Sequence, residues 1–323
     1  FVVPWRIVRQ VRAALARGEF YDVVEVHEPL GGYFAWHRRS LPPLAIFSYG
    51  LEDRSRNAAL AYRRQKGLPV SLKQRYSPLS VVWQACYATR HAAHVVCSNS
   101  EDVNHLHSRG VPLERLTRHH SGVEPDFLEA GATLDFTAPR SDILFLGSWL
   151  LRKGILDLVI AASAVMRRRP EVRLTVAGCG VDESVVLADF DPALRPRIRV
   201  LPSVQGNERL IRLYREHAIF VLPSYFEGQP LVMIEAAALG MGILTTNVCG
   251  MRDFVRDGES GFLVGVGDAA ALTERLDRMV ADPDLVRRLG RAAREQAETH
   301  TWETAARKID SAYRKLVRAG DQA

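Results

Sequence analysis

The stretch AIFVLPSYFEGQPLVMIEAAALG, residues 218–240, decides the fold. It opens with a short apolar run, residues 218–224, which predicts a buried strand. A polar loop with Glu227, Gly228 and Gln229 follows, and Pro230 suits the first turn of a helix, where the N–H that proline lacks would have no partner. A strand, a loop and a helix in this order form part of a βαβ unit, which predicts a parallel sheet.

Short apolar runs on both sides of this stretch alternate with helix-like segments. Further strands are expected at residues 21–29, 44–50, 94–100, 142–148, 173–180, 197–203 and 242–247. Helices are expected at residues 80–92, 155–168 and 207–217, and again through 268–317, where Pro283 separates them. The alternation predicts an α/β fold with two Rossmann-like parallel-sheet domains facing across a cleft, joined by a polar link at residues 134–142.

Length and composition agree with this organisation. The 323 residues leave room for two domains of about 150 residues each. A content of 47% hydrophobic and 25% charged residues is typical of a globular protein. No apolar stretch approaches the ~18 residues that cross a bilayer, which argues against a transmembrane protein. The four cysteines, at positions 86, 97, 179 and 249, lack metal-binding spacing and are typical of a reducing, cytosolic compartment.

The net charge of +6 is concentrated toward the N-terminus, where the segment Arg54–Arg90 carries eight basic residues and no acidic ones. Such a segment indicates an anionic partner, such as phosphate groups or a membrane surface, or else a solvated helical surface. Apolar residues in the same segment favour contact with an anionic membrane, namely Leu68, Val70, Leu72, Leu79 and Trp83. Nucleic acid is not expected as a partner, because the segment matches no recognised nucleic-acid-binding module.

The turn into the Pro230 helix is the expected site of the chemistry. Backbone N–H groups at a helix start, beside a glycine that permits close approach, form an anion site that suits a phosphate. Glu227 and Glu235 flank this turn with seven residues between them. Glu235 lies among apolar residues, where a carboxylate is costly to bury unless it meets hydrogen-bond donors, and a ribose 2′,3′ diol supplies two. The alternative is that Glu235 lies on an exposed stripe and Glu227 only opens the helix.

The pattern S-x-x-E-G-x-P-x-x-x-x-E, residues 224–235, resembles the Glu-x7-Glu signature of retaining family-four glycosyltransferases, which have the GT-B fold. Further segments, in the same order as in that family, are similar to its other elements. They are VVCSNSEDVNHL with HHSGVEPDFL (95–106 and 119–128), FLGSWLLRKGILDLVIAA (145–162), CGMRDFVRDGESGFLV (249–264) and TWETAARKIDSAYRKL (301–316). The resemblance covers nearly the whole chain.

The resemblance implies roles for the matching residues. Glu227 is expected to contact the donor sugar's hydroxyls and stabilise charge at the anomeric centre, and Lys153 to neutralise the departing diphosphate. The nucleotide-sugar is expected to contact Gly147, Ser148, Arg152, Gly228, Gln229, Pro230, Leu231 and Glu235. His27 and Tyr49 are expected on the acceptor side. No cofactor and no metal are expected, because the lysine and helix dipoles replace a divalent ion; the alternative for Lys153 is a solvent-facing position.

Several features depart from the family pattern, among them Cys249 in place of a glycine and Asp253 in place of a glutamate. Ser148 stands where the family often has arginine, so either Arg152 replaces it or one phosphate contact is lost. Tyr49 stands where the family commonly has histidine, and tyrosine does not titrate near neutral pH. The strand, Gly-rich loop and helix with which the family begins are absent from the 323 residues, so we expect the first domain to be incomplete at its N-terminus.

The resemblance also implies the domain boundaries and the activity. The domains are residues 1–133 on the acceptor side, 134–303 for the nucleotide-sugar, and a helix at 304–323 that crosses back to the first domain. The expected reaction moves a sugar, with retention, from a nucleotide-diphosphate sugar to a hydroxyl of a glycan or lipid-linked acceptor of the lipopolysaccharide or exopolysaccharide type. Its expected place is the cytoplasm, at the inner face of the membrane. Two alternatives stay open, namely another GT-B enzyme such as a sugar-nucleotide epimerase, and a non-catalytic nucleotide-sugar- or glycan-binding protein.

Overall fold

The computed structural model of the chain describes residues 2–70, 72, 81–133 and 142–320. The chain divides into two compact units, each with its own parallel sheet. The first unit comprises the described residues of Phe1–His120, Glu227–Gln229 and Glu303–Ala323, and the second those of Ser121–Phe226 and Pro230–Trp302. In the described ranges no helix is both long and apolar enough to cross a membrane. Residues 134–141 of the predicted link lie outside these ranges.

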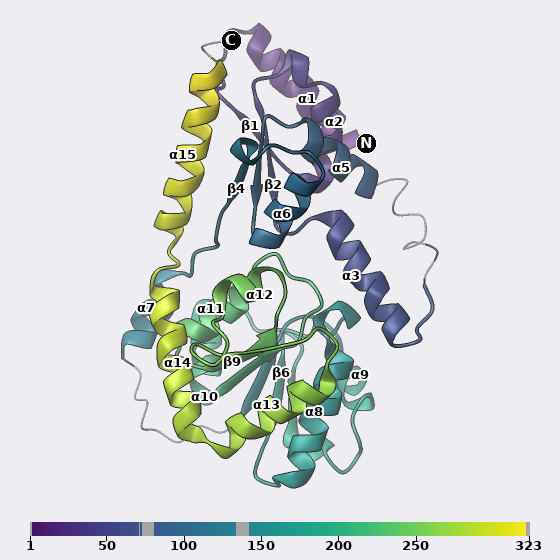
Figure 1. The fold of residues 1–323 in the computed structure, drawn as a ribbon, viewed down its shortest axis with the longest axis vertical. Coiled ribbons are helices and arrows are strands. Elements are labelled where there is room, and N and C mark those ends of the chain that lie inside the picture. Colours follow the sequence, from purple (N-terminus) through teal and green to yellow (C-terminus); the bar gives the residue numbers. More distant parts are fainter. Residues whose placement is uncertain (1, 71, 73–80, 134–141, 321–323) are drawn as a thin grey trace. The chain divides into compact units, whose positions relative to one another are not determined.

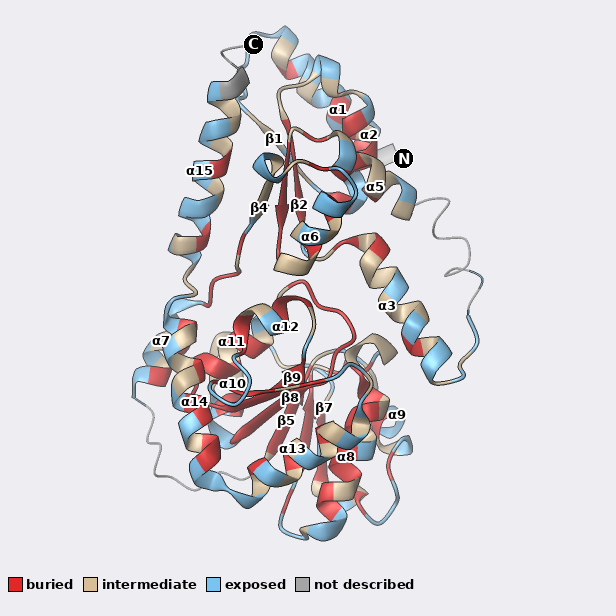
Figure 2. Ribbon diagram, viewed as in Figure 1, coloured by how far each residue is buried: buried red, intermediate tan, exposed pale blue. Residues whose placement is uncertain are grey.

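The second unit is built on a six-stranded parallel sheet. Its strands are β5 (Ile143–Leu146), β6 (Leu174–Ala177), β7 (Ile198–Leu201), β8 (Ile219–Leu222), β9 (Gly242–Thr246) and β10 (Phe262–Val264). β5, β6, β8 and β9 are buried along their whole length (Figure 2), as expected for a parallel sheet with helices on both faces. The helices are α7 (Pro125–Ala132), α8 (Ile155–Arg168), α9 (Glu183–Ala188), α10 (Asn207–Glu216), α11 (Leu231–Ala238), α12 (Cys249–Phe254), α13 (Ala269–Ala281) and α14 (Pro283–Glu298).

The strand order of this sheet, β10-β9-β8-β5-β6-β7, changes direction between β5 and β8. The chain runs outward from β5 through β6 to β7, and outward the other way from β8 through β9 to β10. Right-handed connections that run in opposite directions place α8 and α11 on opposite faces. Accordingly α8 packs against α13 and α11 packs against α14 (Figure 1). The turns after β5 and β8 therefore meet at the carboxyl edge of the sheet, where sheets of this type bind their ligands.

The first unit holds a four-stranded parallel sheet in the order β1-β2-β3-β4. Its strands are β1 (Val24–His27), β2 (Leu44–Ser48), β3 (His94–Cys97) and β4 (Leu116–Arg118). Its helices are α1 (Val2–Ala16), α2 (Gly31–Trp36), α3 (Glu52–Gln65), α5 (Val81–His91), α6 (Ser100–Ser108) and most of α15 (Trp302–Gly320). α2 packs against α5 over a core that includes Phe34, Ile46 and Ala88. The Tyr313 hydroxyl of α15 donates to the carboxylate of Glu25 in β1, which ties this helix to the sheet.

The predicted α/β fold with two parallel-sheet domains is confirmed. Each predicted apolar run contains a strand, and the helix predicted at 155–168 has those bounds. β4 and β10 are not predicted, because strands of three residues leave no apolar run long enough to recognise. The strand predicted at 21–29 is shorter than expected, since residues Glu28–Leu30 form a 3-10 helix that begins with an acid and a proline.

Candidate functional site

The turn between β5 and α8 supplies the first part of the site. Gly147 directly follows β5, and a Cβ atom on it would lie 3.8 Å from Cε of Lys153, so the lysine side chain runs alongside this glycine. Lys153 ends a short 3-10 helix, Leu151–Lys153, and Gly154 follows with a φ of 72°. A Cβ atom on Gly154 would lie 1.9 Å from the backbone oxygen of Pro223. Only glycine therefore lets this turn approach the chain that follows β8.

The turns after β5 and β8 are held together by hydrogen bonds. The Arg152 guanidinium donates from Nη1 to the backbone oxygen of Phe226 over 2.6 Å. The backbone N–H of Tyr225 donates to the backbone oxygen of Arg152 over 2.8 Å. Arg152 thus fixes the junction of the two turns, in addition to the phosphate contact predicted for it. Ser148 is exposed in the first of these turns.

The start of α11 supplies the second part of the site. The helix begins at Leu231, and Pro230 is its N-cap, with φ −75° and ψ 110°. The prediction that Pro230 lies in the first turn is wrong by one residue, because its ψ is extended even though its φ suits a helix. As N-cap, Pro230 has no side chain that can cap this terminus. The first amides of the helix, at Leu231 and Val232, thus stand at the positive end of its dipole.

Glu235 lies in the second turn of α11 and is held by a tyrosine. The Tyr214 hydroxyl of α10 donates to Oε2 of Glu235 over 2.7 Å. Burial raises the pKa of Glu235, whereas the hydrogen bond from Tyr214 lowers it and the nearby carboxylate of Glu124 raises it. Glu235 is therefore not on a fully exposed stripe, which was the alternative, but is partly buried against α10.

In the first unit, the two predicted acceptor-side residues lie together. His27 is the last residue of β1 and Tyr49 directly follows β2. Their rings stack at 5.2 Å between centroids and 21° between planes. The ring of Phe47 lies 4.9 Å from that of Tyr49. Because Tyr49 is 64% exposed, the pair presents an aromatic surface at the carboxyl edge of the sheet.

Two further titratable residues, Glu28 and His119, are buried near this surface. Glu28, directly after β1, accepts hydrogen bonds from the Ser48 hydroxyl over 2.6 Å and from the backbone N–H of Glu52 over 3.2 Å. Burial raises the pKa of Glu28 to about 8. His119 is buried with its ring 4.7 Å from that of Phe47, and burial lowers its pKa to about 4. In the sequence, Glu28 lies at the end of the apolar run 21–29, whereas His119 follows β4, a strand that the sequence does not predict.

The structure thus gathers the predicted residues into two groups. The group in the second unit contains Gly147, Ser148, Arg152, Lys153, Pro230, Leu231 and Glu235. The group in the first unit contains His27, Tyr49, Glu227, Gly228 and Gln229. Across the described ranges, no three His, Cys, Asp or Glu side chains lie close enough together to form a metal site.

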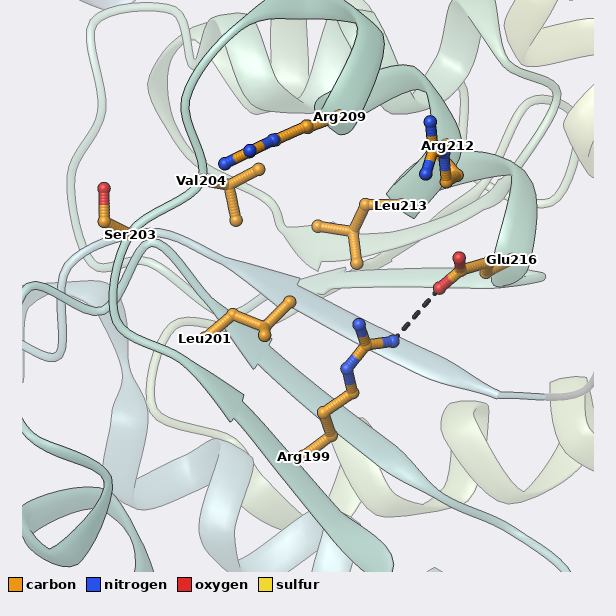
Figure 3. Close-up of a pocket in the computed structure, with 8 residues that line it drawn as sticks. All are labelled: Arg199, Leu201, Ser203, Val204, Arg209, Arg212, Leu213 and Glu216. Carbon is orange, nitrogen blue, oxygen red and sulfur yellow. Dashed lines mark hydrogen bonds and ion pairs between the residues drawn. The ribbon is translucent and has the colours of Figure 1, made fainter.

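A separate cavity of about 260 Å³ lies on the outer edge of the second sheet (Figure 3). It is lined by Arg199, Leu201, Ser203, Val204, Arg209, Arg212, Leu213 and Glu216. Arg199 and Glu216 form an ion pair across it at 3.1 Å, drawn as a dashed line in Figure 3. Both side chains are substantially exposed, and such pairs contribute little to stability. None of the predicted site residues lines this cavity.

Comparison with known proteins gives a consistent result. The model of the family described as "Glycosyl transferases group 1" matches residues 134–296. The chain is 29% identical over 324 residues to the D-inositol 3-phosphate glycosyltransferase of Streptomyces avermitilis, covering 94% of this chain and 67% of that protein. It is also 29% identical over 217 residues to the glycogen synthase of Mycobacterium tuberculosis, covering 66% of this chain and 51% of that protein. The chain therefore spans about two thirds of the first relative and half of the second.

Solved structures share the fold. The sucrose-phosphate synthase of Thermosynechococcus elongatus superposes with a TM-score of 0.72 at 24% identity, covering 93% of this chain and 74% of that one. HepE of Anabaena, solved in complex with UDP and glucose, superposes with a TM-score of 0.64 at 14% identity, covering 99% and 81%. At these identities the likeness concerns the fold alone.

Proposed function

The chain belongs to the group 1 glycosyl transferases, and from this premise we propose that it moves a sugar from a nucleotide-diphosphate sugar to a hydroxyl of a glycan or lipid-linked acceptor, as in lipopolysaccharide or exopolysaccharide synthesis. We propose further that the configuration at the anomeric carbon is retained and that no metal ion takes part. One observation supports donor binding above all. The turn that contains Lys153 is hydrogen-bonded to the turn that leads into α11, and both lie where the strand order of the sheet changes direction.

A diphosphate fits this place for a physical reason. As the bond to the sugar breaks, negative charge grows on the departing phosphate, and a cation already in position stabilises the transition state more than the ground state. Lys153 supplies a full positive charge, and the amides at the start of α11 supply the positive end of a helix dipole. Together they would do the work that a divalent ion does in other transferases. Gly147 would let the phosphates approach the backbone, whereas the Cβ position of Gly228 is occupied by the backbone of Tyr49.

The remaining residues would bind the ribose of the donor, its transferred sugar and the acceptor. Glu235 would accept hydrogen bonds from the ribose hydroxyls, and Glu227 would contact the transferred sugar and stabilise charge at its anomeric carbon. The stacked pair His27 and Tyr49 offers an aromatic surface and a phenol donor to the acceptor. In a retaining reaction the leaving phosphate assists deprotonation of the acceptor hydroxyl, so no further protein base is needed.

The basic segment Arg54–Arg90 supports a place at an anionic membrane surface on the cytoplasmic side. Val70, Leu72 and Trp83 are exposed apolar side chains in it. Arg54, however, pairs with Asp102 at 2.5 Å and so contributes to the fold rather than to that surface. Residues 73–80, which include Leu79, lie outside the described ranges. Sedimentation with anionic vesicles should decrease with salt, and an absence of binding at low salt would contradict this part of the proposal. A phosphorylated acceptor, such as the substrate named for the Streptomyces relative, would suit the same charge.

A second candidate is a nucleotide-sugar- or glycan-binding protein with impaired catalysis. It is favoured by Ser148, which is exposed where the family often has arginine, and by Tyr49 in place of histidine.

One experiment separates the two candidates. The protein is incubated with UDP-, GDP- and ADP-sugars and with hydroxyl acceptors, and the release of nucleoside diphosphate is followed with and without EDTA. Transfer in EDTA, with a product of unchanged anomeric configuration by NMR, supports the proposed function. Nucleotide binding without transfer supports the second candidate. Transfer that stops in EDTA would contradict metal independence.

A further inference from the structure

We infer that Tyr214 is a positioning residue for the donor nucleotide: its hydroxyl fixes one oxygen of Glu235 and thereby aims the carboxylate at the ribose diol. This inference rests on the proposed role of Glu235. It adds a residue that lies outside the Glu-x7-Glu stretch and contacts no ligand itself.

The geometry leaves the Tyr214 hydroxyl little freedom. The side chain is completely buried on α10, and its ring meets that of Phe127 edge to face at 6.1 Å. The hydroxyl oxygen lies 2.7 Å from Oε2 of Glu235 and 3.2 Å from the backbone oxygen of Val232. One hydrogen cannot serve both acceptors fully, and the shorter contact is to the carboxylate, which is also the stronger acceptor. Tyr214 therefore donates mainly to Glu235.

The hydrogen bond leaves enough capacity for a diol. An ionised carboxylate offers about four lone-pair positions on its two oxygens. Tyr214 occupies one on Oε2, so Oε1 and the rest of Oε2 can accept from two hydroxyls. A carboxylate fixed in this way loses less rotational freedom when the nucleotide binds, and preorganisation of this kind increases affinity.

The same contact also affects the pKa of Glu235. Burial raises the pKa of Glu235 and the hydrogen bond from Tyr214 opposes that rise. Burial and Glu235 raise the pKa of Tyr214 well above its usual value, so Tyr214 remains a donor throughout the working range. Glu124, the residue directly before α7, is a charged group near Glu235 and raises the pKa of Glu235 further. A protonated Glu235 would lose an acceptor, so nucleotide affinity should fall as the pH drops through this pKa.

Tyr214→Phe tests the inference, because it removes only the hydroxyl. Affinities for UDP, GDP and ADP are measured by calorimetry, and the nucleotide that binds the wild type is used together with its 2′,3′-dideoxy analogue. We expect Tyr214→Phe to bind the ribonucleotide about tenfold more weakly, the usual scale for one hydrogen bond to a charged group. Affinity for the dideoxy analogue should stay the same. The pH at which acid weakens ribonucleotide binding should move upward.

Tyr313→Phe is the matched control. It also removes a tyrosine hydroxyl that donates to a glutamate, but neither Tyr313 nor Glu25 is among the residues assigned to the donor. It should bind both nucleotides as the wild type does. Thermal unfolding establishes that each variant is folded. If Tyr214→Phe is not folded, Tyr214→His, whose ring donor falls short of Glu235, takes its place with the same expectations.

The outcomes distinguish this inference from the proposal on which it rests. If Glu235→Ala weakens ribonucleotide binding but Tyr214→Phe matches the wild type at every pH, the positioning role is refuted and the ribose role of Glu235 stands. If Glu235→Ala also binds like the wild type, the ribose role itself fails. If Tyr214→Phe weakens the dideoxy analogue as much as the ribonucleotide, Tyr214 supports the fold generally and the inference is overturned.

Discussion

Replacing Gly154 with alanine tests whether the contact between the turns after β5 and β8 controls the site. Gly154 has a φ of 72°, and a Cβ atom there would lie 1.9 Å from the backbone oxygen of Pro223. The left-handed conformation alone costs a residue with a side chain about 1–2 kcal/mol. The overlap adds about 1–3 kcal/mol, the usual range for overpacking. We therefore expect the free energy of unfolding to fall by about 2–5 kcal/mol.

The same substitution should affect turnover. Cβ atoms essentially never approach other heavy atoms within 3.0 Å, so the two turns must separate. A displacement of about 1 Å near reacting groups can lower a rate about 100-fold. We expect a loss of that size in sugar transfer, with stability followed by urea unfolding and turnover by nucleotide release.

Gly258→Ala provides the matched control for this substitution. Gly258 has a similar φ of 77°, but its Cβ position has no other heavy atom within 4 Å. It therefore has the conformational cost without the overlap, and its turnover should stay near that of the wild type. Equal losses of stability and equal turnover in the two variants would refute the reasoning.

Three further predictions concern charge and pH. Lys153→Ala should lower kcat/KM for the donor by about 100-fold, the usual effect of losing one group that stabilises developing charge. The control Arg209→Ala, in the cavity of Figure 3, should leave kcat/KM unchanged. Similar values of kcat/KM for the two variants would count against the role of Lys153. The pKa of Glu28 is about 8 in the folded protein, compared with 4.5 for a free glutamate. Between these pH values the folded state keeps a proton that the unfolded chain releases. The free energy of unfolding should therefore fall as the pH rises from 4.5 to 8. Chemical unfolding at pH 5 and pH 8 should show a smaller fall in Glu28→Gln, and an identical fall would exclude Glu28 as its source. The pKa of His119 is about 4 in the folded protein, compared with 6.5 for a free histidine. The free energy of unfolding should therefore fall as the pH drops from 6.5 to 4, because the unfolded chain binds a proton that the folded state does not. His119→Phe should lose this pH dependence when unfolding is measured at pH 4 and pH 6.5.

The fold could be predicted because parallel strands buried on both faces are short apolar runs. Four strands of the second unit are buried along their whole length, and each lies within a predicted apolar run: β5, β6, β8 and β9. The amphipathic helix at 155–168 was predicted with its correct bounds for a similar reason, since Gly154 precedes it and arginines end it. β1 was overestimated because Glu28 and Pro29 start a turn that an apolar-run criterion does not detect.

The sequence indicates candidate site residues together only where they are close along the chain. Glu227, Pro230 and Glu235 lie on one short stretch, so their spacing suggests a shared site, which stays a prediction. The partner of Glu235 was not found, because Tyr214 is on another helix and their contact depends on how α10 and α11 pack. The stacking of His27 on Tyr49 likewise depends on the pairing of β1 with β2.

The first unit combines segments that are far apart in the sequence, since residues 303–320 join a sheet made from residues 24–118. A ribosome releases a chain from its N-terminus at about 5–20 residues per second. The lobe that comes later in the sequence can therefore finish folding once Trp302 has emerged, while the earlier lobe still waits for Tyr313 to reach Glu25. We therefore expect the two lobes to complete folding in the reverse of their order along the sequence, and a cut before the last helix to destabilise the lobe whose strands are made first.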